Sequence, residues 1–105
     1  MYVVANRVPV AEDWREAFEE RFRARAGQVD QQDGLVRMEV LRPDAEHGAG
    51  IYVVLTHWRD KQAFENWIGS PDFREAHKNP LPKEAFDGEG KLERHEVIIS
   101  SAAVK

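Results

Sequence analysis

Cysteine is absent from the 105 residues of the chain, and so is any long apolar run. The first absence excludes disulfide bonds, thiolate metal sites and cysteine nucleophiles. A membrane-spanning helix needs about 20 consecutive apolar residues, and a secretory leader needs a basic start before an apolar core. The opening segment MYVVANRVPV supplies neither. We therefore expect a soluble, unprocessed protein without a membrane partner, and the lack of cysteine fits a reducing cytoplasm.

The chain also lacks an excess of positive charge. Its formal net charge is -4, and acidic and basic residues are interspersed along the sequence. A nucleic-acid surface needs a basic stripe that displaces counterions from the phosphates. We therefore expect a small-molecule or protein partner and no nucleic acid.

Several sequence patterns of catalytic and cofactor sites are missing as well. The GEG at residues 88–90 is too short for a phosphate-binding loop, so we expect the chain to hold no flavin or nicotinamide of its own. The histidines show no HxH or HExxH spacing for a zinc or non-haem iron site. No glycine pattern marks a nucleophilic serine.

The residues that are present predict one domain over 1–105, because this length supports a single core. Alternating or β-branched segments predict strands, and apolar residues at helical spacing predict helices. The expected strands are 1–10, 35–43, 51–58 and 92–100, and the expected helices are 12–26, 61–68 and 70–78. The proline-rich and glycine-rich stretch 79–91 is expected to be a surface loop.

Local signals mark where the helices begin and end. Gly27 is expected to end the first helix, and Asp60 to cap the second. Ser70 followed by Pro71 predicts a third helix start, because proline suits the first helical position. The inward residues of these helices are expected to be Trp14, Ala17, Phe18, Phe22, Ala63, Phe64, Trp67, Ile68, Phe73, Ala76 and His77.

This order of elements predicts an α+β ferredoxin-like sandwich, with helices on one face of a four-stranded antiparallel sheet. The first and third strands nevertheless carry apolar residues on both faces. Those residues include Met1, Val3, Ala5, Tyr52, Val54 and Trp58. A second sheet must cover the face that the helices leave open, so we expect a homodimer with its sheets packed face to face.

Three residues could carry chemistry in a pocket on the helix side. Asn6 interrupts an apolar strand face, so its amide either bonds to nearby backbone or donates to a ligand. Trp67 is either ordinary core or a pocket wall. His77 is either a partly exposed histidine near a helix end or a neutral imidazole that ligates a metal or haem iron. Each residue alone favours the structural alternative.

Three segments together resemble the antibiotic biosynthesis monooxygenase superfamily: ANRV, ERFRARAG and HWRDKQAFENWIGSPDFREAH. Within that superfamily the chain looks most like the haem-degrading monooxygenases of bacterial iron acquisition. The resemblance covers nearly the whole chain up to Asn79. Its most specific feature is the trio Asn6, Trp67 and His77, which falls on matching positions and favours the functional alternative for all three.

The resemblance implies a homodimer whose sheets form a joint α/β barrel, with one haem pocket per subunit. It implies that His77 is the proximal iron ligand, that Asn6 orients dioxygen, and that Trp67 presses on the porphyrin and ruffles it. Haem would be both substrate and cofactor, and the porphyrin would be opened with dioxygen and electrons from an external reductant, releasing iron.

The flat apolar body of haem requires an apolar pocket, and its propionates favour cations near the mouth. We expect the pocket to be lined by Val4, Val8, Phe22, Phe64 and Phe73. Arg21 and Arg25 lie one helical turn apart and match basic positions of the family, so they are the candidates for the propionates.

Two other functions fit the same pocket. A cofactor-free monooxygenase of an aromatic polyketide or quinol would use Asn6 and Trp67 to position its substrate, with His77 incidental or a base. A haem carrier or sensor would use the same three residues without turnover.

Overall fold

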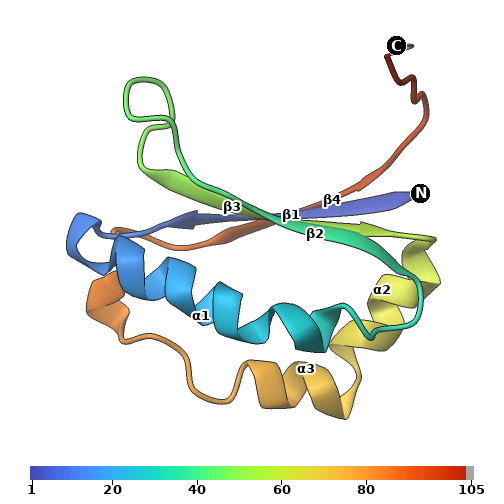
Figure 1. The fold of residues 1–105 in the computed structure, drawn as a ribbon, viewed down its shortest axis with the longest axis horizontal. Coiled ribbons are helices and arrows are strands. Elements are labelled where there is room, and N and C mark those ends of the chain that lie inside the picture. Colours follow the sequence, from blue (N-terminus) through green and yellow to red (C-terminus); the bar gives the residue numbers. More distant parts are fainter. Residues whose placement is uncertain (104–105) are drawn as a thin grey trace.

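The computed structural model describes residues 1–103, apart from the side chains of 25–28 (Figure 1). The elements in chain order are β1 (Tyr2–Pro9), a 3-10 turn η1 (Glu12–Trp14), α1 (Arg15–Val29), β2 (Leu35–Leu41), β3 (Ile51–Trp58), α2 (Lys61–Ile68), α3 (Pro71–Ala76), a second 3-10 turn η2 (Lys83–Ala85) and β4 (Lys91–Glu96).

The four strands form one antiparallel sheet in the order β2-β3-β1-β4. All three α-helices lie on the same face of this sheet, and the opposite face is left open (Figure 1). The expected ferredoxin-like α+β sandwich is therefore confirmed. No described helix is long and apolar enough to cross a membrane.

The caps predicted for α2 and α3 are present. The carboxylate of Asp60 accepts a hydrogen bond from the backbone amide of Ala63 at 2.8 Å, and the hydroxyl of Ser70 accepts one from the amide of Phe73 at 3.1 Å. Each side chain satisfies an amide that lacks a partner inside its helix. These caps fix the start of both helices, and the helices carry two walls of the site described below.

α1 differs from its expected bounds at both ends. A 3-10 turn precedes it, and the helix continues past Gly27 to Val29. Glycine permits a helix to end but does not force an end. The chain turns instead at Gly34, whose φ of 86° is a left-handed conformation that favours glycine.

β4 is shorter than predicted. It ends at Glu96, which lies opposite Tyr2 at the start of β1, and Val97 adds one more bond by donating its amide to the carbonyl of Met1 at 2.9 Å. Among the described residues, this bond to Met1 is the last backbone contact between the two strands. The following residues leave the sheet (Figure 1), and Ile98 and Ile99 are 87% and 84% exposed.

The loop between α3 and β4 was expected to lie at the surface, but its second half packs against the sheet. Ala85 is fully buried, its carbonyl accepts a hydrogen bond from the amide of Ala11 at 2.8 Å, and Phe86 forms an isolated bridge with Val10. These contacts close one end of the core.

The core divides into two clusters on the helix side of the sheet. The first contains Tyr2, Val4, Trp58, Ala63, Phe64 and Trp67, and the second contains Val8, Val10, Phe18 and Tyr52. The first cluster lies beneath α2 and includes three residues of its inward stripe, which places aromatic rings next to the strands β1 and β3.

Strand register identifies the residues of the open face. Tyr52 pairs with Val8 and Trp58 pairs with Tyr2, and both are buried on the helix side of the sheet. Val54 alternates with them along β3 and lies on the same side. These three residues therefore do not lie on the open face, and the prediction of a dimer was wrong to count them there. The apolar residues of the open face include Val3, Ala5, Leu41, Ile51, Val53 and Leu55. Both faces of the sheet are therefore apolar as predicted, but Ile51, Val53 and Leu55 supply the open face of β3 in place of Tyr52, Val54 and Trp58.

Candidate functional site

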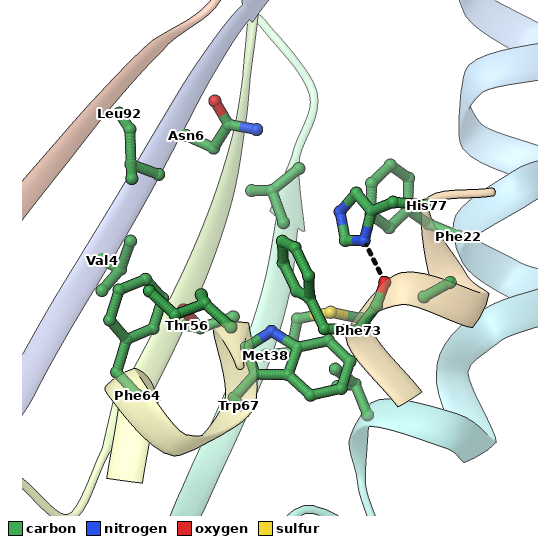
Figure 2. A pocket seen from close by; sticks show the side chains of 14 residues that line it. Val4, Asn6, Phe22, Met38, Thr56, Phe64, Trp67, Phe73, His77 and Leu92 are labelled. Carbon is green, nitrogen blue, oxygen red and sulfur yellow. Dashed lines mark hydrogen bonds between the residues drawn. The ribbon is translucent and has the colours of Figure 1, made fainter. Parts of the chain in front are cut away.

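A cavity of about 220 Å³ lies between the helix side of the sheet and the helices α2 and α3 (Figure 2). Its walls are predominantly apolar and aromatic, which is typical of small-molecule sites. The lining residues are Val4, Asn6, Phe22, Val29, Met38, Val54, Thr56, Phe64, Trp67, Ile68, Phe73, Ala76, His77 and Leu92. The trio singled out in the sequence, Asn6, Trp67 and His77, therefore lines one cavity.

His77 follows the last residue of α3 and caps its carboxyl end. Its Nδ1 lies 2.8 Å from the carbonyl oxygen of Phe73, one turn earlier. Since a carbonyl only accepts, Nδ1 is the donor in this bond, and the tautomer that fits it has its lone pair on Nε2. Figure 2 shows the second ring nitrogen on the side of the ring toward Asn6. His77 is exposed, and its ring stands at the cavity edge with a second nitrogen that bonds to no described residue.

The ring of His77 is further held by stacking. It lies on the ring of Phe73 with centroids 4.1 Å apart and an angle of 30° between the planes. Two contacts with one residue, the backbone hydrogen bond and the ring stack, therefore set the direction of the imidazole. Among the described lining residues, His77 has the one titratable side chain.

Asn6 lies on β1 between Val4 and Val8 and is half-buried. Its amide makes no hydrogen bond to any other described residue, and its nitrogen points into the cavity in Figure 2. The structural alternative, a bond to neighbouring backbone, is thus not found in the described part of the chain. A polar group on an apolar wall without a protein partner is available to a ligand.

Trp67 is 8% exposed and belongs to both the core and the cavity wall. Its ring stacks on Trp58 with centroids 6.5 Å apart and meets Phe73 edge to face at 5.4 Å. The indole nitrogen makes no hydrogen bond within the described residues and lies on the cavity side of the ring (Figure 2). Trp67 is therefore both a core residue and part of the cavity wall.

The expected apolar lining is largely present. Phe22, Phe64 and Phe73 line the cavity together with Val4. Val8 does not, because it packs in the second core cluster with Phe18 and Tyr52. A strand rises by about 3.3 Å per residue, so four residues along β1 are enough to move a side chain out of the site.

The two arginines expected at the mouth differ in what the structure describes. Arg21 does not line the cavity, and its guanidinium donates to the backbone carbonyl of Asn79, two residues after His77. The side chain of Arg25 lies outside the described residues. Arg21 thus contacts the segment that follows the histidine, and a propionate contact by either arginine stays a prediction.

Several lining residues were not anticipated from the sequence. They include Met38 of β2, Val54 and Thr56 of β3, and Leu92 of β4. Each is brought to the cavity by strand pairing between segments far apart in the chain. The alternation in IYVVLTHW puts Val54 and Thr56 on the same strand face as Trp58. This pattern could have predicted that these two residues face the cavity.

A strong charge cluster lies beside the cavity. Glu19 of α1 accepts hydrogen bonds from Arg42 and from the hydroxyl of the buried Tyr52, and it also pairs with Arg23. The hydrogen bond from Arg42, followed by that from Tyr52, lowers the pKa of Glu19 from 4.5 to about 2. Its acceptors are therefore occupied, and the cluster ties α1 to β2 and β3.

The fold and this cavity define a ferredoxin-like protein with an apolar ligand site that carries one histidine. Residues 1–79 match the family model of antibiotic biosynthesis monooxygenases. A haem oxygenase (staphylobilin-producing) of Staphylococcus saprophyticus is 31% identical over 87 residues, which cover 83% of each chain. The chain belongs to the antibiotic biosynthesis monooxygenase family.

Two solved structures share the fold closely. The haem degrader MhuD of Mycobacterium tuberculosis, with two haems bound in its active site, has a TM-score of 0.78 and 27% identity over 97% of this chain and 100% of that one. A MhuD variant with two manganese protoporphyrin IX molecules per active site has a TM-score of 0.82 and 26% identity over 98% of this chain and 100% of its own.

Proposed function

We propose that this protein is a haem-degrading monooxygenase that binds haem through His77 as the proximal iron ligand. The observation that carries the proposal is the hydrogen bond from Nδ1 of His77 to the carbonyl of Phe73, which leaves Nε2 as the ring nitrogen available to a metal at the cavity edge. Histidines that ligate metals are commonly held in this way by a backbone carbonyl. The likeness to a haem oxygenase and to haem-bound MhuD supports haem as the molecule that the cavity binds.

The lining fits the body of a porphyrin. Aromatic rings from three elements, Phe22, Phe64 and Phe73, offer flat apolar surface. The enclosed volume of about 220 Å³ lies below the range of about 300 to 1,000 Å³ for ligand sites. We therefore expect the carboxylate edge of the porphyrin to remain at the mouth, where Arg21 and Arg25 of α1 are the proposed cations.

Haem supplies the redox chemistry when it is bound, with electrons from an external reductant and dioxygen as the oxidant. The chain itself contributes position and polarity. With haem bound, the amide nitrogen of Asn6 would orient dioxygen through a hydrogen bond, and the indole of Trp67 would press on the porphyrin and distort it. Both side chains are suited to these roles because they face the cavity with donors that no described residue uses.

We further propose that two copies of the chain pair through their open sheet faces. The apolar residues of this face, which include Val3, Ala5, Leu41, Ile51, Val53 and Leu55, need a cover that one copy does not provide. The same chain also exposes Ile98 and Ile99 just beyond β4. A second copy that packs its own open face against this one, sheet on sheet, covers these apolar residues and the two isoleucines. The cavities of both copies then lie on the outer, helix-covered sides.

Titration with hemin tests the proposed function. We expect one haem per chain and a Soret band typical of an imidazole ligand, followed by bleaching and capture of iron by a chelator once ascorbate and dioxygen are supplied. His77→Ala should lose the imidazole-ligated spectrum. The matched control is His47→Ala, because that exposed histidine contacts Asp44 in a turn outside the cavity.

The outcomes separate the alternatives. Binding without bleaching would identify a haem carrier. A failure to bind hemin, together with turnover of a quinol without added cofactor, would identify the cofactor-free monooxygenase. An unchanged spectrum in His77→Ala would remove the ligand assignment.

A further inference from the structure

Arg94 of β4 is a cation on the side of the sheet that faces the helices. It lies directly opposite Val4 of β1, which is 3% exposed and lines the cavity. Side chains directly opposite one another in paired strands share a face. Arg94 is therefore two residues from the lining residue Leu92 and on the same side of the strand.

The guanidinium of Arg94 makes four contacts with two other elements. Its Nε donates to the hydroxyl of Tyr2 at 2.5 Å, and its Nη2 donates to the carboxylate of Glu65 at 2.7 Å. Its Cζ lies 4.9 Å from the ring centroid of Phe64 and 5.5 Å from that of Tyr2. Such a planar cation can bond in its plane and stack on rings at the same time.

These contacts join an edge strand to the helix that forms one wall of the cavity. In the described sheet β4 is an edge strand that pairs with β1, and Phe64 and Glu65 are consecutive residues of α2. Trp67 lies three residues after Phe64, so both side chains emerge on the same face of the helix. Any rotation of α2 about its axis that breaks the contacts of Arg94 also turns Trp67 relative to the cavity.

The side chain of Trp67 makes no directional contact that opposes this rotation. It meets the rings of Trp58 and Phe73 and makes no hydrogen bond in the described part of the chain, while the backbone carbonyl of Trp67 accepts hydrogen bonds from the amide and hydroxyl of Ser70 beyond the end of α2. Stacked and edge-to-face rings tolerate sliding better than a short charged hydrogen bond does. On the side of α2 that faces β4, the directional contact among the described residues is that of Arg94 with Glu65.

We propose that Arg94 is a positioning residue: through Glu65 and Phe64 it sets the angle of α2, and thereby the angle at which the indole of Trp67 faces the cavity. The consequence for haem rests on the function proposed above. In the haem-bound protein, Arg94 would set how strongly Trp67 distorts the porphyrin, although Arg94 itself would contact neither the iron nor its ligands. The alternative is that Arg94 only contributes to folding stability.

The test has one readout without haem and one with it. In the free protein, the stacked pair Trp58 and Trp67 should give a coupled signal in the near- and far-ultraviolet circular dichroism. Arg94→Gln and Glu65→Gln should both change this signal, and Arg94→Lys should restore part of it. Arg23→Gln is the matched control, since Arg23 also pairs with two carboxylates, those of Glu19 and Glu20, on an exposed helix face.

With hemin, the same variants should keep the imidazole-ligated Soret band of the parent protein. Resonance Raman bands of out-of-plane porphyrin distortion should weaken, and bleaching should slow by about tenfold, the lower end of outer-shell effects. The double variant of Arg94 and Glu65 should resemble either single variant, because both changes remove the same contact.

Two results distinguish the failures. If the parent protein does not bind hemin but the dichroism signal changes in Arg94→Gln and not in Arg23→Gln, the proposed function fails and the positioning role stands. If Arg94→Gln lowers the melting temperature while dichroism and distortion bands match those of the parent protein, the positioning role is overturned and Arg94 is structural.

Discussion

The imidazole of His77 lies on the ring of Phe73, 4.1 Å between centroids, and bonds through Nδ1 to the carbonyl of that same residue. The two residues are four positions apart across the end of α3, so the ring and the carbonyl come within reach of one imidazole. Both contacts are local to one helical turn. The direction of the imidazole is therefore built into α3 before any ligand arrives.

Phe73→Leu should weaken haem binding without removing the ligand. The backbone carbonyl remains, but the imidazole loses the ring on which it stacks, so its preferred direction is less well fixed. We expect the hemin dissociation constant to rise by about tenfold, measured by Soret titration. Phe86→Leu serves as a control because Phe86 packs against the second core cluster, outside the cavity. An equal loss in both variants would point to a general effect on folding.

Asn6→Ala should retain haem and its imidazole-ligated spectrum but bleach slowly. The lost donor lies on the wall that faces the cavity and has no partner among the described residues, so its removal leaves no other protein group unpaired. We expect bleaching slower by at least about tenfold in single-turnover experiments. Asn66→Ala should bleach at the parental rate, since Asn66 is exposed on α2 and bonds to Gln62. Parental bleaching in Asn6→Ala would remove its role.

Trp67→Phe and Trp58→Phe should separate two effects of neighbouring rings. Trp67 lines the cavity, whereas Trp58 is fully buried behind it and bonds to Thr56. We expect Trp67→Phe to weaken the out-of-plane Raman bands of bound haem, and Trp58→Phe to lower the free energy of unfolding with those bands kept. Unaltered bands in Trp67→Phe would show that this indole does not distort the porphyrin.

Leu55→Asp should convert a dimer to a monomer, because it places a charge at the centre of the open face. Sedimentation equilibrium measures the mass directly. Ala24→Asp is the control, since Ala24 is exposed on α1, away from that face. Removal of residues 97–105 should weaken the dimer as well, because it deletes the exposed Ile98 and Ile99. A parent protein that sediments as a monomer would exclude the pairing.

Glu19 predicts a pH dependence of stability. Hydrogen bonds from Arg42 and Tyr52 lower its pKa from 4.5 to about 2 in the folded protein. Above pH 4.5 the carboxylate is ionised in both states and its contribution to stability is complete. As the pH falls from 4.5 toward 2, Glu19 becomes protonated in the unfolded state while it stays ionised in the folded state, so the free energy of unfolding decreases.

Urea denaturation at a series of pH values measures this decrease. Glu19→Gln keeps an acceptor for the hydroxyl of Tyr52 but has no charge to titrate. The difference in unfolding free energy between the two proteins should therefore shrink as the pH is lowered. A constant difference across that range would show that Glu19 is not held ionised by its partners.

Local signals predicted part of this architecture well. The bounds of β3 and α2 match those expected, and the capping side chains of Asp60 and Ser70 act as predicted. A cap is satisfied within three residues of itself, so its sequence is enough to indicate it. The helical stripes likewise predicted that Phe64, Trp67 and Phe73 point inward.

Long-range pairing explains what was missed. β4 was expected to reach residue 100, but its length is limited by where β1 begins, since Tyr2 is the partner of Glu96. Alternation in a strand gives the face of a side chain but not its place along the sheet, so Val8 was assigned to the cavity wrongly. Met38 and Leu92 reach the site only through strand pairing.

The sequence by itself determined the order of elements, the caps and the apolar stripes, because each depends on residues within one or two turns of one another. It also supplied the trio Asn6, Trp67 and His77 through a family resemblance. Only the tertiary structure decided that these three line one cavity and that Arg94 of the edge strand contacts Glu65 and Phe64 of α2. Those facts depend on contacts between distant segments, which packing creates and no local pattern records.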